Sequence, residues 1–387
     1  MPNPTATSAD APVLMQEIPL GTAQKFRLGR LTLNRPTALN ALNLDMIEIL
    51  LQQLQAWSND PSIVMVWLEG AGDRAFCAGG DVVEVYLSMA RNGAEINQHA
   101  VDYFSREYRL DHLIHTYRKP LVCWGQGVVM GGGLGLLAGA GYRVVTDQSR
   151  LAMPEITIGL FPDVGGSWFL NRMPGHTGRF AALTGAQLNA ADALFAGLAD
   201  RYIAHDQKAK VLHALRNASW NGEEAQDHLT VDRLLREFAQ LSSRTKPMAE
   251  SNLRQHFDRI NQLVDHPTLA ETVYAISGLR DDDPWLQKAA QTLQHGSPSS
   301  AYVIDRQLRQ TRTASLVEVF QQELNLAVAC CHLGEFQEGV RALLVDKDKA
   351  PQWQFPDIAS VEPAFVEAHF DTALNPNPLQ DLSRSTK

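Results

Sequence analysis

Hydrophobic and polar positions follow two different periods along the first 200 residues, which predicts both strands and helices. Residues 25–34 alternate apolar and polar side chains, apart from a slip at Gly29, and this predicts two short strands around a turn. Residues 43–57 repeat apolar side chains every three or four positions, which predicts an amphipathic helix with Asn43 as its N-cap. Residues 63–68 are all apolar, and such a run predicts a strand buried in a parallel sheet.

Glycine-rich segments follow two of the predicted strands, and each leads into a predicted helix. Residues 70–80 (GAGDRAFCAGG) precede a helix that begins after Asp81, and residues 131–133 (GGG) follow a buried strand over residues 120–124. A repeated strand-strand-helix order of this kind describes a spiral α/β core that ends near residue 204.

Strand patterns nearly vanish after residue 204, and helical periodicity replaces them. The segments with this periodicity cover residues 207–217, 230–241, 247–263, 286–294 and 316–332. We therefore predict a spiral core over residues 13–204 and a helical C-terminal region over residues 205–374. Residues 1–12 and 375–387 are polar or proline-rich, and we expect both ends to be flexible.

Composition excludes several classes of protein. Hydrophobic residues make up 45% and charged residues 20% of the 387 residues, which excludes a disordered or fibrous chain. The net charge of -9 argues against nucleic acid or an anionic membrane as a partner. Four cysteines without CxxC spacing predict neither disulfides nor a zinc site, so we expect no metal and a reducing, cytoplasmic location. Residues 120–142 carry no charge, but eight of these 23 residues are glycine, which favours a buried strand, loop and helix over a membrane span.

The two glycine-rich turns could each direct free backbone N–H groups at one oxygen. Glycine permits close approach, and the first N–H groups of a helix have no acceptor within that helix. Two such donors would form an oxyanion hole. The alternative is that the glycines serve only tight packing of strand against helix.

Two carboxyl groups stand in an apolar setting in residues 153–166 (MPEITIGLFPDVGG). Burial there would raise the pKa of Glu155 and of Asp163, and would suit them to proton transfer or nucleophilic attack. The alternative gives both side chains a structural role, with Asp163 as the N-cap of a helix that begins at Val164.

A dinucleotide-binding site is a competing interpretation of residues 133–138, which match GxGxxA, with Glu155 lying 20 residues beyond Gly135. The fingerprint normally opens the first βαβ unit of its domain, whereas here about 130 residues precede it. The motifs GxxxxGK[ST], HExxH and GxSxG are absent from the sequence, so phosphate-loop, zincin and nucleophile-elbow chemistry lack their signatures.

Taken together, the motifs resemble the crotonase, or enoyl-CoA hydratase/isomerase, superfamily. The resemblance rests on residues 34–36 (NRP), 39–42 (LNAL), 75–81 (AFCAGGD), 131–133 (GGG) and 154–155 (PE). A second set is similar to the 3-hydroxyisobutyryl-CoA hydrolase branch, namely residues 153–166, 297–300 (SPSS) and 336–348 (FQEGVRALLVDKD). The similarity extends from about residue 29 to about residue 370.

The resemblance implies a crotonase-like spiral fold and hydrolysis of a short 3-hydroxyacyl-CoA thioester, as in valine catabolism. Coenzyme A is then part of the substrate, and no separate cofactor is needed. A homo-oligomer is one possibility, because superfamily members often assemble through their C-terminal helices, but the extended helical region here could cover that surface instead, so the oligomeric state stays open. The residues implied as catalytic are the backbone donors Gly80 and Gly132 and the carboxyls of Glu155 and Asp163. The residues implied as substrate contacts are the acid Glu107, Arg74 near a phosphate, Ala78 and Val82 near the adenine, and Ala41.

One departure from the superfamily pattern bears on the reaction. Hydratases of the superfamily carry a catalytic Glu shortly after the glycine run, where this chain has Gly135. The resemblance therefore favours hydrolysis, with enoyl-CoA hydration or isomerisation and a catalytically silent acyl-CoA-binding protein as alternatives. The acyl group stays open, because isobutyryl and propionyl skeletons differ by one methyl group, which is worth about 1–3 kcal/mol. An anhydride and a general-base route are both open.

Overall fold

The computed structural model describes residues 10–22, 24–92, 96–280 and 282–384 of the chain. Contacts within it divide the chain into two compact units, each built from three segments. Unit 1 consists of Met1–Gly80, Leu110–Leu151 and Leu188–Ser251, and unit 2 consists of Asp81–Arg109, Ala152–Gln187 and Asn252–Lys387. The predicted division at residue 204 runs along the sequence and stays a prediction.

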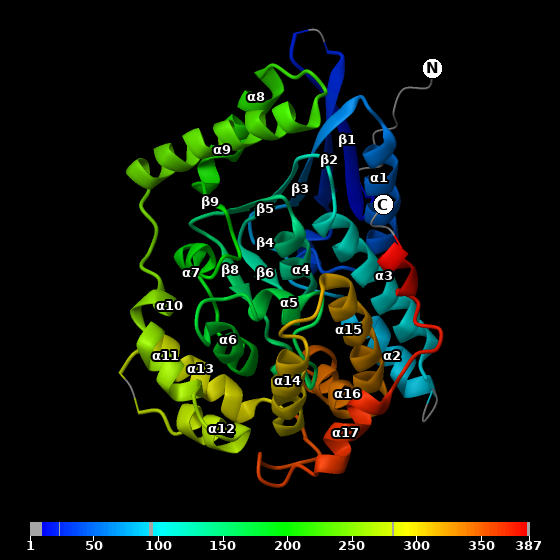
Figure 1. Ribbon diagram of the computed structural model, residues 1–387, viewed down its shortest axis with the longest axis vertical. Helices are drawn as coiled ribbons and strands as arrows, with labels where there is room; N and C mark the ends of the chain where they lie inside the picture. The colour runs from blue at the N-terminus through cyan, green and yellow to red at the C-terminus, as the bar shows by residue number, and fades with distance from the viewer. Residues whose placement is uncertain (1–9, 23, 93–95, 281, 385–387) are drawn as a thin grey trace. The chain divides into compact units, whose positions relative to one another are not determined.

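Unit 1 contains a sheet of six strands in the order β1-β2-β3-β5-β7-β9 (Figure 1). These strands are β1 (Val13–Leu20), β2 (Phe26–Leu33), β3 (Ile63–Gly70), β5 (Leu121–Gly125), β7 (Tyr142–Val145) and β9 (Arg201–Tyr202). The edge strand β1 pairs antiparallel with β2, and every later pairing is parallel. A second sheet has the order β4-β6-β8, formed by β4 (Ala75–Cys77), β6 (Val128–Met130) and β8 (Arg150–Ala152).

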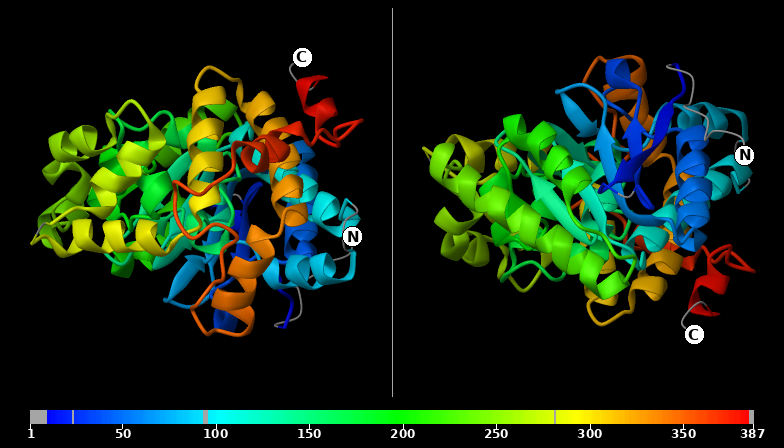
Figure 2. Two further views of the ribbon diagram at one scale, coloured as in Figure 1. Left: turned by 90° about the horizontal axis from the view of Figure 1, so that it is seen from below. Right: turned by 90° about the horizontal axis from the view of Figure 1, so that it is seen from above.

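The helices of unit 1 pack against the larger sheet and enclose an apolar core. They are α1 (Leu44–Asn59), α4 (Gly132–Gly139), α7 (Ala190–Phe195), α8 (Lys208–Asn217) and α9 (Glu224–Thr245). Helix α1 lies against β1 and β2, as Figures 1 and 2 show. In the core, the rings of Trp67 on β3 and Trp124 on β5 stack with centroids 5.4 Å apart. The continuous apolar runs of β3 and β5 are explained by this burial on both faces.

Unit 2 is largely helical in its described part. Its helices are α2 (Val82–Asn92), α5 (Gly166–Leu170), α6 (Thr177–Thr184), α10 (Asn252–Gln255), α11 (Phe257–Val264), α12 (Leu269–Ser277), α13 (Pro284–His295), α14 (Pro298–Gln310), α15 (Leu316–His332), α16 (Glu335–Val340) and α17 (Pro363–Asp371). The 3-10 turn η2 (Glu155–Ile158) belongs to it as well. Helix α3 (Gln98–His115) begins in unit 2 and ends in unit 1. Helices α11, α12 and α13 pack together in sequence order (Figure 2).

Most predicted elements are confirmed. Helix α1 has Asn43 as its N-cap, with the side-chain oxygen accepting from Met46 N. Residues 120–142 form β5, β6 and α4, and none of the described helices is long and apolar enough to cross a membrane. The C-terminal segments are helical, as predicted.

The predicted turn at Gly29 is wrong, because β2 runs without a break from Phe26 to Leu33. A Cβ placed on Gly29 would lie 2.5 Å from the ring of Trp57. The glycine therefore serves the close approach of Trp57 on α1, and the backbone stays extended. The sequence pattern did not predict strand β1 (Val13–Leu20).

The tail predicted to be flexible makes specific contacts over residues 375–384. The side chain of Leu379 is fully buried, and Asp381 pairs with Arg109 at 2.8 Å. At the other end, Pro12 O accepts from Asn34 N at 2.8 Å. Residues 1–9 and 385–387 of the two predicted flexible ends lie outside the described residues.

Candidate active site

The two glycine-rich turns of unit 1 touch each other. The first turn follows β4 and contains Gly79, whose φ of +110° is a conformation that favours glycine. A Cβ on Gly79 would lie 3.2 Å from Met130 O and 3.7 Å from Gly132 N. The backbone that carries Gly80 therefore runs beside the backbone that carries Gly132.

Two observations bear on the predicted donors, the N–H groups of Gly80 and Gly132. Leu42 N donates to Gly79 O at 2.8 Å, and this bond does not use the N–H of Gly80. Helix α4 begins at Gly132, and N–H groups of a first helical turn have no acceptor within the helix. The role of these two N–H groups as donors to one oxygen stays a prediction.

The packing interpretation of the glycine run applies to Gly133. A Cβ on Gly133 would lie 2.3 Å from Cys77 O, so α4 could not approach β4 with any larger residue there. The packing role of Gly133 and a donor role for Gly132 are compatible, because they belong to different residues of the run.

The LNAL motif at residues 39–42 runs beside the first glycine turn. Ala78 N donates to Leu39 O at 3.0 Å, which places the half-buried Ala41 and Ala78 in neighbouring loop segments. Asn40 is fully buried, and its side-chain amide donates to Ala71 O and Ala75 O at 3.0 Å each. The motif thus fixes the loop that leads into the turn.

Two further predicted substrate contacts lie outside this motif. The side chain of Arg74 is exposed, and Val82 is the first residue of α2 in unit 2.

Three carboxyl groups lie close together in unit 2. Glu155 opens η2, Asp163 follows it, and Glu107 lies on α3, with exposures of 4%, 5% and 2%. Oε2 of Glu155 and Oε1 of Glu107 have no hydrogen-bond partner among the described residues. Buried polar atoms are normally paired, so unpaired carboxyl oxygens at one place indicate a site that a ligand completes.

The pKa values of this cluster follow from its burial. Burial raises the pKa of Glu155 well above its ordinary value, and the neighbouring charges of Asp163 and Glu107 raise it further. Burial and the charge of Asp163 raise the pKa of Glu107 in the same way. The pKa of Asp163 rises only to about 6, because hydrogen bonds from Tyr108 and from a backbone N–H oppose the effect of burial. The predicted burial and raised pKa of Glu155 and Asp163 are therefore confirmed.

The turn that carries Asp163 is strained. Val164 has a φ of +53° and is 1% exposed, although a β-branched side chain rarely adopts this conformation. Such a residue costs on the order of 1–3 kcal/mol, which the surrounding structure must supply. Helix α5 begins only at Gly166, with Gly165 as its N-cap. The alternative role of Asp163 as N-cap of a helix from Val164 is therefore wrong, and its side chain accepts from Tyr108 instead.

Two buried glutamates from the C-terminal helices hold the turns of the cluster. Glu323 on α15 accepts hydrogen bonds from the N–H groups of Gly165 at 2.7 Å and Ser167 at 3.0 Å. Glu335 on α16 accepts from the hydroxyls of Ser297 and Ser299, within the SPSS motif.

The SPSS motif also supports η2 directly. Ser297 N donates to Ile156 O at 2.9 Å, one residue after Glu155. The motif is thereby linked to the carboxyl cluster by a backbone hydrogen bond, which gives a physical reason for its place in the sequence.

Sequence analysis did not find Tyr108, Glu323 or Glu335. One signal was available for Glu323, because it stands on the apolar face of α15 beside Phe320 and Leu324, where a solvated glutamate does not belong. Tyr108 is the residue after Glu107 and gave no separate signal.

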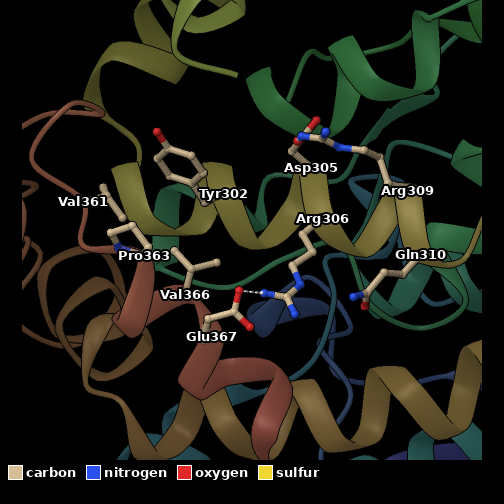
Figure 3. A pocket seen from close by; sticks show the side chains of 9 residues that line it. All are labelled: Tyr302, Asp305, Arg306, Arg309, Gln310, Val361, Pro363, Val366 and Glu367. Carbon is tan, nitrogen blue, oxygen red and sulfur yellow. Dashed lines mark ion pairs between the residues drawn. The ribbon is translucent and has the colours of Figure 1, made fainter. Parts of the chain in front are cut away.

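A separate cavity of about 450 Å³ lies between α14 and α17 in unit 2 (Figure 3). Its apolar lining includes Tyr302 on α14 and Val366 on α17, and the ion pair of Arg306 and Glu367 joins the two helices at 2.6 Å. None of the predicted site residues lines this cavity.

Comparisons with known proteins agree on the fold and differ in the named reaction. The family model of enoyl-CoA hydratase/isomerase matches residues 28–370. A mitochondrial 3-hydroxyisobutyryl-CoA hydrolase from Gallus gallus is 38% identical over 345 residues, which is 88% of this chain and 86% of that protein.

Two solved structures share the fold over nearly the whole chain. A carnitinyl-CoA dehydratase from Mycobacterium thermoresistibile is 36% identical with a TM-score of 0.81, covering 95% of this chain and 98% of that one. An enoyl-CoA hydratase from Rhodobacter sphaeroides is 32% identical with a TM-score of 0.79, covering 95% of this chain and 99% of that one. The crotonase-type fold predicted from the sequence is thereby confirmed.

Proposed function

Because this chain belongs to the enoyl-CoA hydratase/isomerase family, we propose that it hydrolyses a short 3-hydroxyacyl-CoA thioester, of the 3-hydroxyisobutyryl-CoA type, to the free acid and CoA. The observation that carries the proposal is the buried carboxyl cluster of Glu155, Asp163 and Glu107, in which two oxygens lack a partner among the described residues. The name of the Gallus gallus relative supports the same reaction.

The backbone donors act on the thioester oxygen in this proposal. The N–H groups of Gly80 and Gly132 bind the carbonyl oxygen and stabilise the negative charge that develops on it during attack. Removing one donor of such a pair typically lowers turnover by about 10²- to 10³-fold. Coenzyme A lies along the first glycine turn, with Ala78 and Val82 near the adenine and Arg74 near a phosphate, and Ala41 is a further substrate contact.

The carboxyl of Glu155 carries the bond-breaking step by one of two routes. In the anhydride route its oxygen bonds to the thioester carbon, the carbon–sulfur bond breaks, and the proton of the neutral acid ends on the CoA sulfur. Water then cleaves the anhydride to the product acid and regenerates Glu155. In the general-base route the ionised carboxylate takes a proton from water while the water oxygen bonds to the thioester carbon. The carbon–sulfur bond then breaks, and the proton passes from Glu155 to the CoA sulfur.

The other two acids hold the substrate hydroxyl. The hydrogen bond from Tyr108 favours the ionised form of Asp163 and opposes the rise of its pKa on burial, so Asp163 accepts a hydrogen bond from the 3-hydroxyl group. Burial and the charge of Asp163 raise the pKa of Glu107, which favours its protonated form, and that form can donate to the same hydroxyl. A substrate without the 3-hydroxyl would leave these buried groups unpaired, which is a strong basis for selectivity.

Hydration of an enoyl-CoA is the second candidate, favoured by the names of the two solved structures. Helix α4, from Gly132 to Gly139, carries no carboxyl side chain, and position 135 is glycine. Addition of water by a pair of glutamates therefore lacks its first acid, which is why we place hydrolysis ahead of it.

A panel of acyl-CoA substrates tests the proposal with the full chain. Thiol release from 3-hydroxyisobutyryl-CoA and 3-hydroxypropionyl-CoA, followed with a thiol reagent, is the expected result. Loss of enoyl absorbance from crotonyl-CoA without thiol release would instead identify a hydratase, and binding with neither would identify a silent binding protein.

Glu155→Gln should lower thiol release by about 10²- to 10⁴-fold while acyl-CoA binding by calorimetry persists. The exposed Glu362→Gln is the matched control and should leave the rate unchanged.

We also propose a cytoplasmic location and a homo-oligomer. All four cysteines are buried free thiols, which supports a reducing compartment. The Gallus gallus relative is named as mitochondrial, so cell fractionation must distinguish the two compartments. Light scattering of the purified chain tests the assembly.

A further inference from the structure

Glu323 is a fully buried glutamate in the middle of α15, and both of its carboxyl oxygens are used. Oε2 accepts from Gly165 N at 2.7 Å, and Oε1 accepts from Ser167 N at 3.0 Å and from the Ser167 hydroxyl. Burying a carboxyl is costly unless it is hydrogen-bonded, so these three bonds account for its presence in the core. All three reach one short segment that begins two residues after Asp163.

That segment needs support, because its backbone is held in an unfavourable conformation. Val164 has a φ of +53° and Gly165 a φ of +80°, and Gly166 N closes the turn on Asp163 O at 2.6 Å. A β-branched residue stays in the left-handed region only where its surroundings fix the backbone on both sides. The groups that donate hydrogen bonds to Glu323 follow directly after Val164, so these bonds restrain the backbone at the position where the strained conformation requires it.

We propose that Glu323 is a positioning residue for Asp163. By holding the N–H groups of Gly165 and Ser167, it sets the strained turn in the one conformation that presents the Asp163 carboxyl to the substrate hydroxyl. The inference rests on the hydrolase function proposed above, and it adds a residue to which the resemblance assigns no role. It also gives helix α15 a part in the reaction.

Neighbouring contacts fit a positioning role better than a simple helix cap. Helix α5 has only five residues, so its dipole contributes little to holding the buried Glu323 carboxyl. Tyr108, which donates to Asp163, also contacts the ring of Phe320, three residues before Glu323, with the rings tilted and their centroids 6.0 Å apart. Helix α15 therefore contacts Asp163's partner and Asp163's turn together.

A double-mutant cycle in the full chain tests the proposal. Glu323→Gln keeps the size of the side chain but offers one acceptor oxygen in place of two, so the turn loses part of its support. We expect kcat for 3-hydroxyisobutyryl-CoA to fall by about 10- to 100-fold, with KM changed by less than about threefold. In an Asp163→Asn background the same change should lower kcat by less than about threefold, because Glu323 acts through Asp163.

The opposite pattern would overturn the proposal. An equal loss of kcat in both backgrounds means that Glu323 supports the fold in general, and an unchanged kcat in the parent background means that it has no part in the reaction. Asp305→Asn serves as the control for lost stability, since Asp305 is another buried carboxylate, on α14, that pairs with Arg179 at 2.8 Å. It should lower the melting temperature and leave kcat of the folded enzyme within about twofold.

A second variant covers the case in which Glu323→Gln does not fold. Ser167→Ala removes only the hydroxyl bond to Glu323 and leaves both backbone bonds in place. We expect a kcat loss of about two- to fivefold that again disappears in the Asp163→Asn background, and a loss that persists there would contradict the proposal.

Failure of the proposed function is separable from failure of this inference. An unaltered chain that releases no thiol from any 3-hydroxyacyl-CoA refutes the hydrolase function. Hydrogen exchange then decides whether Glu323 holds the turn. The Gly165 and Ser167 amides should exchange at least about tenfold faster in Glu323→Gln than in the parent, and equal exchange would refute the support itself.

Discussion

The hydroxyl of Tyr108 donates a 2.7 Å hydrogen bond to Oδ2 of Asp163. Both side chains are buried, so the bond is formed away from water, where an ionised acceptor gains most from it. Burial raises the pKa of Asp163 and this bond lowers it, with the result at about 6. Tyr108 thus controls the pH at which Asp163 becomes a carboxylate.

Tyr108→Phe should move the acidic limb of the pH–rate profile upward. Without the hydroxyl, only a backbone N–H opposes burial, so the pKa of Asp163 rises further above about 6. A bond to a charged group is worth about 1.5–3 kcal/mol, which corresponds to a shift of about one to two pH units in the acidic limb of kcat/KM. Tyr202→Phe is the matched control, because it removes a 2.7 Å bond to Lys246 O in unit 1 and should leave the limb in place. An unmoved limb in Tyr108→Phe would exclude Asp163 as the group that sets it.

Gly133→Ala should impair both stability and turnover. Its Cβ would lie 2.3 Å from Cys77 O and 2.8 Å from Cys77 Cβ, so β4 and α4 must separate. We expect about 1–3 kcal/mol of lost stability and a kcat lower by about 10²-fold, because both glycine turns shift. Gly141→Ala is the control, since its Cβ would meet only Leu121 O at 3.8 Å. Equal rates for the two variants would show that the turns tolerate displacement.

Gly29→Ala should destabilise unit 1 without touching any proposed catalytic group. The new Cβ would lie 2.5 Å from the ring of Trp57, which cannot turn away because its Nε1 donates to Glu17 at 2.9 Å. Urea denaturation should show a loss of about 1–3 kcal/mol relative to Gly141→Ala. A variant as stable as the parent would mean that α1 shifts without cost.

Glu323→Gln should make stability less dependent on pH. Burial raises the pKa of Glu323 to about 8 in the folded chain, against an ordinary value of 4.5. A raised pKa means that the folded state favours the neutral acid, so this contribution is complete below about pH 4.5 and is lost as the pH rises through about 8.

Urea denaturation at pH 5, 7 and 9 measures the difference. The free energy of unfolding of the parent should fall with pH by a few kcal/mol more than that of Glu323→Gln, which has no proton to lose at this position. Asp163 titrates in both proteins, so it cancels in the comparison. Parallel curves would mean that Glu323 ionises in the folded state near its ordinary pKa.

Local signals in the sequence were sufficient for the elements that depend on neighbours along the chain. Helix α1 could be predicted because its N-cap and its apolar spacing lie within 16 residues. The setting of Glu155 and Asp163 could be predicted because the apolar side chains around them are adjacent in sequence. Their roles in catalysis came from the resemblance and stay predictions.

Relationships between distant segments could not be predicted from periodicity. Gly29 was interpreted as a turn because its partner, Trp57, is brought to it only by the packing of α1. Glu323 bonds to Gly165 across 158 positions of the sequence, and nothing local to either residue specifies the other. Strand β1 has polar and apolar positions without clean alternation, since it is an edge strand and only its ends are buried.

The order of the segments has a consequence for how the protein is made. A ribosome releases the last segment of unit 1 at Ser251, but unit 2 still lacks α10 to α17 at that moment. The strands β4 and β6, which precede the glycine turns, can therefore pair before Glu323 and Glu335 have been synthesised. Glu155 and Asp163 are already present in the chain at that stage. A nascent chain halted before α15 would carry a complete sheet and a carboxyl cluster that lacks Glu323 and Glu335, so premature termination there should give a folded but inactive fragment of unit 1 with an unpacked, protease-sensitive remainder.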